Sequence, residues 1–337
     1  MKRPTLIRMQ PRPRLVLEYL GSGERTLNFR EAVSDGLARH PRSIPPMFFY
    51  DAEGSRLFEQ ITELPEYYPT RTETRILSKH ADAILDMAGD LAHLVELGSG
   101  SATKTRLLLD AIAKRQNPVI YTPIDISQAM VMEFSDRLLE DYPSLQIHGL
   151  ICDYHRALEA LRSDPSQGRL FLFLGSSLGN FTPTQSIKLL QDVRSAMSPR
   201  DRFLLGLDLK KDPAVLYWAY NDAQGVTAAF NRNLLARINR ELGGGFDLER
   251  FQHVAFYDER QGRIEMHLES VESQLVPVKA LGQTYTFQKG ERIHTENSYK
   301  FDSAGIEFMA REAGFSVAGQ WHDDQGWFGI TLLAPRE

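Results

Sequence analysis

The stretch LVELGSGSATKT, residues 94–105, decides the fold. An apolar run ends in an acidic residue and leads into a loop with two glycines, Gly98 and Gly100. A phosphate-binding loop of the GxxxxGK(S/T) type does not fit, because Lys104 follows Gly100 by four residues. A dinucleotide-binding loop of the GxGxxG type does not fit either, because Thr103 occupies its third glycine position. The loop therefore suits a nucleoside that carries no pyrophosphate.

Apolar runs alternate with amphipathic stretches between residues 93 and 209. The runs are HLVEL, PVIYTPID, LQIHGLICD, RLFLFLG and RFLLGLDL, with TRLLLDAIAKR and QAMVMEFSDRLLEDY among the stretches between them. Strands that are apolar on both faces and separated by helices are typical of a parallel sheet covered by helices on both sides. The tail adds a helix, DSAGIEFMAREAG, and two strands joined by the polar turn DDQ. We therefore expect an α/β fold whose sheet ends in a hairpin.

The pattern changes after Asp208. PAVLYWAYNDAQGVTAAFNRNLLARINREL is helical, whereas FQHVAFYDE, RIEMHLESV and LVPVKALGQTYTF alternate as strands do. In the second of these, Ile264, Met266 and Leu268 share one face. We expect a small antiparallel unit inserted into the α/β domain. Residues 1–69 show no parallel-strand pattern, and residues 1–14 are expected to form a basic, solvated arm.

Composition and charge narrow the class of protein. Of the 337 residues, 42% are hydrophobic and 25% charged, and the net charge is −5, which gives no general attraction for nucleic acid or anionic membranes. No apolar run approaches the ~20 residues that cross a bilayer. The single cysteine, Cys152, lies in an apolar run and is expected to be a buried structural thiol. We expect a cytoplasmic protein that binds neither nucleic acid nor membranes.

Two acidic residues stand where a ligand of such a sheet would lie, beyond the carboxyl ends of the strands. TPID ends in Asp125, 27 residues after Gly98, where a carboxylate can accept both ribose hydroxyls. LICDY places Asp153 where it can accept from an adenine amino group. Each acid also precedes a helical stretch, so helix N-capping is an alternative for both. The loop, the two acids and the terminal hairpin together resemble the S-adenosylmethionine-dependent methyltransferases.

Longer stretches resemble one family of these enzymes, the histidine-specific methyltransferases. They are PPMFFYDAEGSRLFEQITELPEYYPTRTE (45–73), GSSLGNF (175–181), DPAVLYWAYNDAQGVTAAFNRN (212–233), RIEMHL (263–268) and HTENSYKF (294–301). The resemblance covers about residues 15–335. It implies a Rossmann-like class I methyltransferase domain, residues 70–209 and 299–337, that binds S-adenosylmethionine. It also implies a discontinuous α+β substrate-binding domain, residues 15–69 and 210–298.

The resemblance also implies site residues. Those expected to contact the cofactor are Tyr50, Gly98, Lys104, Asp125, Asp153 and Tyr154. Those expected to contact histidine are Tyr67, Gly175, Asn180, Tyr220, Met266, Glu296 and Ser298, of which Asn180, Gly175 and Tyr67 would serve the reacting amine. The last motif fits the family pattern T-E-x-S-x-K-F, with Asn297 and Tyr299 at the variable positions.

These residue types also suit a free amino acid on chemical grounds. Asn180 and Tyr220 offer neutral donors for a carboxylate without adding charge near a sulfonium. Glu296 can accept an imidazole N–H and Ser298 can serve the other ring nitrogen, because side chains two residues apart on an extended segment point to one face. Taken alone, Glu296 would also fit a surface ion pair, and the tyrosines Tyr67 and Tyr220 would also fit packing roles.

The resemblance implies up to three methyl transfers to the α-amino group of L-histidine, which give trimethylhistidine (hercynine) for ergothioneine biosynthesis. Lys104 would meet the carboxylate of the cofactor, and we expect neither a strong catalytic base nor a metal. We also expect a monomer with a small-molecule substrate. Two alternatives stay open: a related N-methyltransferase for a tryptophan-like or modified histidine substrate, and a silent S-adenosylmethionine-binding scaffold that regulates a partner.

Overall fold

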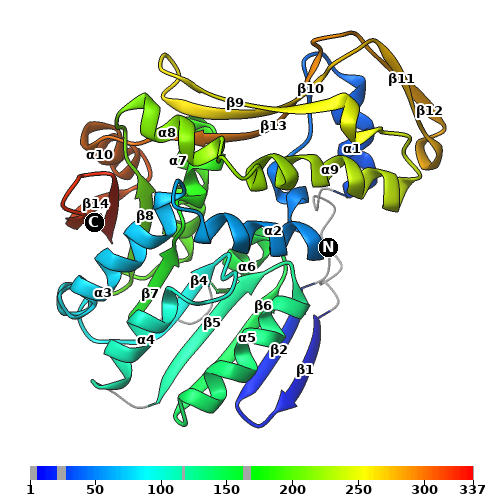
Figure 1. The fold of residues 1–337 in the computed structure, drawn as a ribbon. Helices are drawn as coiled ribbons and strands as arrows, with labels where there is room; N and C mark the ends of the chain where they lie inside the picture. Colours follow the sequence, from blue (N-terminus) through cyan, green and yellow to red (C-terminus); the bar gives the residue numbers. More distant parts are fainter. Residues whose placement is uncertain (1–5, 21–27, 116–117, 162–167, 337) are drawn as a thin grey trace.

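The computed structural model describes residues 6–20, 28–115, 118–161 and 168–336. A large sheet fills the lower part of Figure 1, and a smaller sheet lies at the top, with α2 and α9 between them. The large sheet has nine strands: β1 (Leu6–Arg12), β2 (Leu15–Leu20), β4 (Leu91–Leu97), β5 (Val119–Asp125), β6 (Leu145–Ile151), β7 (Gly168–Phe173), β8 (Arg202–Asp208), β14 (Phe315–His322) and β15 (Phe328–Pro335).

The strands of the large sheet follow the order β1-β2-β6-β5-β4-β7-β8-β15-β14. From β2 to β8 each neighbouring pair is parallel, whereas β15 runs antiparallel to β8 and pairs with β14 as a hairpin. The predicted α/β fold, with its parallel strands and terminal hairpin, is therefore confirmed. The strand order reverses beside β4, so the loop after β4 opens at the point where open α/β sheets bind ligands.

Helices cover both faces of this sheet. Buried side chains of α3 (Tyr68–Ala88), α4 (Thr105–Ala113) and α5 (Gln128–Asp141) pack on one face, and those of α6 (Tyr154–Leu161), α7 (Pro183–Ala196) and α10 (Ser303–Glu312) pack on the other. In β4, Leu94 belongs to the first of these clusters and Val95 to the second. Alternate residues of a strand point to opposite faces, so a strand buried on both sides is largely apolar.

The N-terminal residues differ from the sequence interpretation. Residues 6–12 form the edge strand β1, and residues 15–20 form β2, which pairs in parallel with β6. Leu15 and Leu17 are fully buried in the large-sheet core. Residues 6–12 are therefore an edge strand and not a free arm, although residues 7–12 are exposed to solvent as expected. Residues 15–20 lie in the large sheet instead of the substrate-binding unit. Residues 1–5 lie outside the described part.

The small sheet follows the order β3-β13-β10-β9, and a separate hairpin lies beside it. Its strands are β3 (Arg42–Ser43), β9 (Phe251–Asp258), β10 (Arg263–Ser270) and β13 (Arg292–Tyr299); the hairpin is β11 (Gln274–Val278) and β12 (Gln283–Phe287). One expected strand, LVPVKALGQTYTF, is thus two strands joined by η4 (Lys279–Leu281). Around the small sheet lie α1 (Phe29–Ala38), α2 (Ala52–Glu63), α8 (Pro213–Tyr220), α9 (Val226–Leu242) and the short helices η1 (Pro46–Phe49) and η3 (Leu248–Arg250).

The small sheet has a hydrophobic core of its own. Its buried members come from residues 32–68 and 216–293, and they include Ile264, Met266 and Leu268 of β10, as the alternation predicted. Cys152 is buried among the large-sheet side chains, and burial raises the pKa of its thiol to about 12. A thiol with so high a pKa is a poor nucleophile, which agrees with a structural role. Within the described ranges, no helix combines the length and apolar character needed to cross a bilayer.

Leu17→Ala tests whether the N-terminal strands belong to the core. Because Leu17 is fully buried, the substitution should lower the free energy of unfolding by about 2–5 kcal/mol in urea titrations. Ile7→Ala, in β1 at 54% exposure, is the control and should change it by less than about 0.5 kcal/mol. Equal, small effects of the two substitutions would contradict the placement of β2 in the sheet.

Candidate active site

The loop after β4 approaches the start of α6 closely. Gly98 has a φ of 71°, and its N–H donates to the carbonyl of Ile124 at 2.9 Å. A Cβ at Gly98 would lie 2.8 Å from Tyr154 Oη, so a larger residue would collide with the tyrosine and strain the backbone. Gly100, with a φ of 49°, also adopts a left-handed conformation. The structure therefore brings together Gly98 and Tyr154, two of the residues that the sequence assigned to the cofactor.

The two acids at the strand ends differ in their local roles. The N-cap of α5 is Ser127, so the capping alternative is wrong for Asp125. Burial raises the pKa of the Asp125 carboxyl, although the N–H groups of Ser127, Gly100 and Ile126 oppose that shift. Asp153, in contrast, accepts from the backbone N–H of Arg156 at 3.1 Å and so caps α6. Capping one N–H does not use up the acceptor capacity of a carboxylate.

Lys104 does not stand alone at the end of the loop. Its Nζ lies 2.6 Å from Oε2 of Glu73, whose side chain is fully buried. The carboxylate of Glu73 also accepts the N–H of Gly175 at 2.9 Å. A Cβ at Gly206 would lie 1.9 Å from Glu73 Oε1, so this position in β8 requires glycine to make room for the carboxylate. Glu73 therefore joins the loop after β4 to the loop after β7, a role that the sequence interpretation did not assign.

Four side chains from separate elements lie close enough to affect one another's charge. They are Tyr50, which follows η1, Tyr67, which precedes α3, Tyr220 at the end of α8, and Glu296 in β13. Burial raises the pKa of each tyrosine hydroxyl, and the negative charge of Glu296 raises all three further. Tyr154 also raises the pKa of the Tyr50 hydroxyl. Tyr50, 41% of whose surface is exposed, therefore lies near a cofactor candidate, Tyr154, and near a substrate candidate, Glu296.

Glu296 is buried without a partner. Only 8% of the residue is exposed, and in the described part of the chain no side chain or backbone group forms a hydrogen bond or ion pair with its carboxylate. Burial raises its pKa to about 7, and the positive charge of Lys300 opposes this shift. The alternative of a surface ion pair is therefore wrong. A buried carboxylate without a partner is costly, which makes it a candidate for contact with a ligand.

Ser298 lies two residues further along β13 and has two partners. Its Oγ lies 2.7 Å from Tyr220 Oη and 2.8 Å from Lys300 Nζ. Lys300 is itself paired with Asp208, at 2.8 Å, and both residues are buried. Tyr220 is therefore tied into a polar network as well as packed in the core. The motifs in the sequence pointed to neither Lys300 nor Asp208, although a charged residue near the end of the apolar run RFLLGLDL is a usable signal.

The short helix η2 (Ser177–Asn180) brings Asn180 to β13. A Cβ at Gly179 would lie 2.8 Å from the carbonyl oxygen of Tyr299 and 3.6 Å from Ser298 Oγ, so η2 packs directly against that strand. The Asn180 amide has no side-chain hydrogen bond within the described residues. Gly175, which precedes η2, has a φ of 78° and donates its N–H to Glu73.

The remaining candidates lie on β10 and β13. Met266 is buried and stands opposite Glu296 in the register of the two strands, so their side chains are neighbours on one face. Tyr299 extends from the other face, where its hydroxyl and ring contact Arg263. The tyrosine at this variable motif position therefore does not narrow the space around Glu296.

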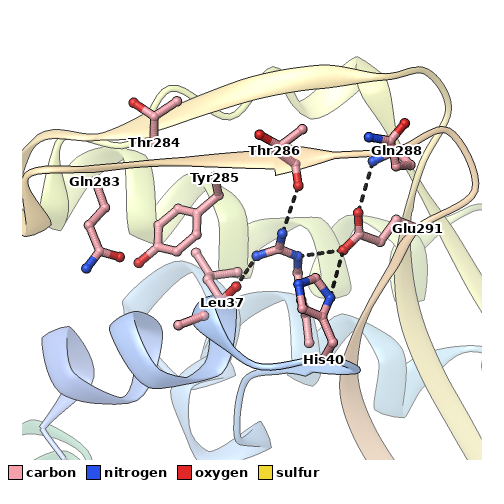
Figure 2. A pocket seen from close by; sticks show the side chains of 10 residues that line it. Leu37, His40, Gln283, Thr284, Tyr285, Thr286, Gln288 and Glu291 are labelled. Atoms are coloured by element: carbon pink, nitrogen blue, oxygen red, sulfur yellow. Dashed lines mark hydrogen bonds and ion pairs between the residues drawn. The ribbon is translucent and has the colours of Figure 1, made fainter.

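A separate groove of about 450 Å³ lies between the end of α1 and β12 (Figure 2). Its buried cation, Arg42, donates to Glu291 at 2.7 Å and to the carbonyl of Thr286 at 2.7 Å. None of the residues assigned from the sequence lines this groove. Its charged groups already have partners, so we do not regard it as the active site.

Comparison with known proteins identifies the family. Residues 29–335 match the family described as histidine-specific methyltransferase, SAM-dependent. The chain belongs to this family. It is 42% identical over 315 residues to a histidine N-alpha-methyltransferase of Mycolicibacterium smegmatis, an alignment that covers 93% of this chain and 97% of that one. It is 26% identical over 314 residues to a 4-dimethylallyltryptophan N-methyltransferase of Penicillium roqueforti, covering 88% and 92%.

Among solved structures, an S-adenosylmethionine-dependent methyltransferase from Clostridium acetobutylicum aligns with a TM-score of 0.46 and 10% identity, over 84% of this chain and 99% of that chain. Family membership makes the chain an S-adenosylmethionine-dependent methyltransferase with S-adenosylmethionine as its methyl donor. The resemblance predicted from the motifs is therefore confirmed.

Glu296→Gln should stabilise the ligand-free protein at high pH. This carboxyl ionises near pH 4.5 in the unfolded chain and near pH 7 in the folded protein. The free energy of unfolding therefore falls as the pH rises from 4.5 to 7 and stays at its lower value above pH 7. The neutral amide removes that loss, and urea unfolding at pH 8 should show a gain of about 1–3 kcal/mol that disappears at pH 4. A loss of stability at pH 8 would show that the folded protein provides a partner for the carboxylate.

Proposed function

We propose that this enzyme transfers methyl groups from S-adenosylmethionine to the α-amino group of L-histidine, up to three times, and so forms trimethylhistidine (hercynine) for ergothioneine biosynthesis. The observation that carries the proposal is the unpartnered, buried carboxylate of Glu296, two residues from the hydroxyl of Ser298. An imidazole ring has two nitrogen atoms, and each of these two groups can form a hydrogen bond with one of them. The 42% identity with a histidine N-alpha-methyltransferase supports the same substrate.

We assign the cofactor to the residues around the loop after β4. Asp125 would accept the ribose hydroxyls, Asp153 and Tyr154 would contact the adenine, and Lys104 would meet the carboxylate of the methionine end. The close approach of Gly98 to Tyr154 and the half-buried carboxyl of Asp125, whose pKa is raised, fit a nucleoside there. When bound, S-adenosylmethionine supplies an electrophilic methyl group on a sulfonium sulfur.

Each sheet would bind one of the two substrates. The large sheet would hold the cofactor at the ends of β4, β5 and β6, and the small sheet would hold histidine at β13. Tyr50 would lie between the two sets of residues, because both Tyr154 and Glu296 raise the pKa of its hydroxyl. It can therefore line the wall that both molecules share.

The chain's contribution to the chemistry is mainly the orientation of the amine, since a sulfonium is already a good leaving group. The attacking amine must be uncharged, and a desolvated site disfavours its ammonium form. Asn180, whose amide has no partner within the described residues, and the carbonyl of Gly175 would orient it. Tyr67 and Tyr220 have hydroxyls of raised pKa, so neither acts as a base; Tyr67 would be a neutral donor, whereas Tyr220 donates its hydrogen to Ser298.

A tryptophan-like substrate is the second candidate, because one relative is named for that substrate. An indole ring has one N–H and no acceptor nitrogen, so it could use Glu296 but would leave the hydroxyl hydrogen of Ser298 without an acceptor. A buried polar group that loses its partner discriminates strongly against the wrong substrate. The pair of Glu296 and Ser298 therefore favours histidine.

The proposed activity can be tested directly. The purified protein is incubated with S-adenosylmethionine and an equimolar mixture of the twenty amino acids, and the products are analysed by mass spectrometry. We expect mass gains of one, two and three methyl groups on histidine alone. Methylation of tryptophan and not histidine would favour the second candidate, and no methylated product would overturn the proposed function.

Glu296→Ala tests the assignment of Glu296 to the imidazole. Loss of a charge-assisted hydrogen bond should raise the KM for histidine by roughly 10- to 100-fold. Binding of S-adenosylmethionine, measured by calorimetry, should change less than about twofold. Glu265→Ala is the matched control, because Glu265 lies on the neighbouring strand and is paired with Arg263. Equal losses of histidine and cofactor binding would refute the assignment.

A further inference from the structure

A buried ammonium group lies directly behind the residues that face the imidazole. Lys300 is 4% exposed, and its Nζ lies 2.8 Å from Asp208 Oδ2, 2.8 Å from Ser298 Oγ and 3.2 Å from Tyr220 Oη. An ammonium has three N–H donors and no acceptor. Each of its three hydrogens therefore has an acceptor, and both hydroxyl oxygens must accept from Lys300.

Lys300 donates to both hydroxyls, and the geometry of the contact between them makes Tyr220 the donor and Ser298 the acceptor. Tyr220 accepts from Lys300 and donates its own hydrogen to Ser298 at 2.7 Å. Ser298 thus accepts twice, from Lys300 and from Tyr220, and both lone pairs of its oxygen are used. The hydroxyl hydrogen of Ser298 is then available for a ligand, so Ser298 can donate a hydrogen bond to a ligand but cannot accept one from it.

Asp208 holds Lys300 in this position. Its buried carboxylate also accepts from Tyr68 Oη at 2.7 Å and from Lys211 Nζ at 2.5 Å. Burial alone would raise the pKa of Asp208, but the charges of Lys300 and Lys211 outweigh it and hold that pKa below its usual value. The carboxylate stays ionised, and Lys300 is anchored at the end of β8.

We propose that Lys300 is a positioning residue that makes Ser298 an obligate hydrogen-bond donor, so that Ser298 and Glu296 together select a ring with one N–H and one bare nitrogen. The ring form that fits is the neutral imidazole. Imidazolium carries two N–H groups and would place one donor against another at Ser298. This inference rests on the proposed function and adds the protonation state of the bound substrate.

Lys300 also acts on Glu296 through its charge. The groups that face Glu296 are the hydroxyls of Tyr50, Tyr67 and Tyr220, all of raised pKa and therefore neutral, and the ammonium of Lys300. Lys300 lowers the pKa of Glu296 against the effect of burial. Removal of Lys300 should therefore raise the pKa of Glu296 and move the acidic limb of histidine binding to higher pH.

Nitrogen NMR tests the inference on the wild-type protein. Histidine labelled with ¹⁵N in the ring is bound to the protein saturated with S-adenosylhomocysteine, at pH 6, below the ring's ordinary pKa of about 6.5. We expect one protonated and one bare ring nitrogen in the bound state. Two protonated nitrogens would overturn the role of Lys300, whereas no binding of histidine at all would overturn the proposed function and the inference with it.

Two lysine substitutions then test whether Lys300 positions the Ser298 hydroxyl or only balances the charge of Asp208. Lys300→Met removes the donor to Ser298 and Tyr220, and Lys211→Met removes the other lysine from the same carboxylate without touching either hydroxyl. Calorimetry should show histidine affinity at least tenfold lower in Lys300→Met and within about threefold of wild type in Lys211→Met. Affinity for S-adenosylhomocysteine should stay within about twofold in both variants.

The pH profile gives the second readout of the same variants. Lys300→Met should move the acidic limb of histidine binding to higher pH, and Lys211→Met should leave it in place. Equal effects of the two substitutions on affinity and on pH profile would mean that Lys300 only balances the charge of Asp208, which would overturn the inference. Should Lys300→Met not fold, the NMR measurement on the wild-type protein decides the question.

Discussion

The carboxylate of Glu296 sets the constraint on which the site depends, because the folded chain buries it and provides no hydrogen bond for it. Its surroundings are three neutral tyrosine hydroxyls and, further back, the ammonium of Lys300. A group held in this way is unfavourable in the free protein and becomes favourable when a ligand donates to it. In the proposed function, the ring N–H of histidine would donate to this carboxylate and offset the cost of its burial.

The two sheets must be held at a fixed distance, because methyl transfer needs the amine and the methyl group in line. The pairing of Asp208 from β8 with Lys300 from the end of β13 connects them, and backbone pairing of Leu209 with Phe301 lies beside it. On the other side, Glu73 of α3 joins the loop that carries Lys104 to the loop that carries Gly175. These ion pairs would position the proposed histidine site relative to the proposed cofactor site.

The sequence predicted much of the fold because the signals involved are local. Apolar runs for β4 to β8 and the terminal hairpin follow from periodicity, and the alternation of Ile264, Met266 and Leu268 gave the buried face of β10. The edge strand β1 and its neighbour β2 were missed, because strands of mixed polarity near a terminus resemble a solvated arm until the partner of β2, strand β6, is known. The turn at η4 was missed because both of its flanking strands continue one alternation.

The candidate site was less predictable than the fold. Asp125 and Asp153 looked alike in the sequence, and only the structure shows that Ser127 caps one helix while Asp153 caps the other. Glu73, Asp208 and Lys300 were not assigned, because each depends on a partner far away in the chain. The direction of the hydrogen bonds at Ser298 depends on all of these contacts at once.

The most direct test of this account is the pKa of Glu296, measured by carbon NMR with ¹³C-labelled glutamate carboxyls and assigned with Glu296→Gln. The account predicts a pKa near 7 in the protein with bound S-adenosylhomocysteine alone, and a value well below that once histidine is added. A pKa near the ordinary value of about 4.5 in the histidine-free protein, or a value that histidine does not change, would contradict it.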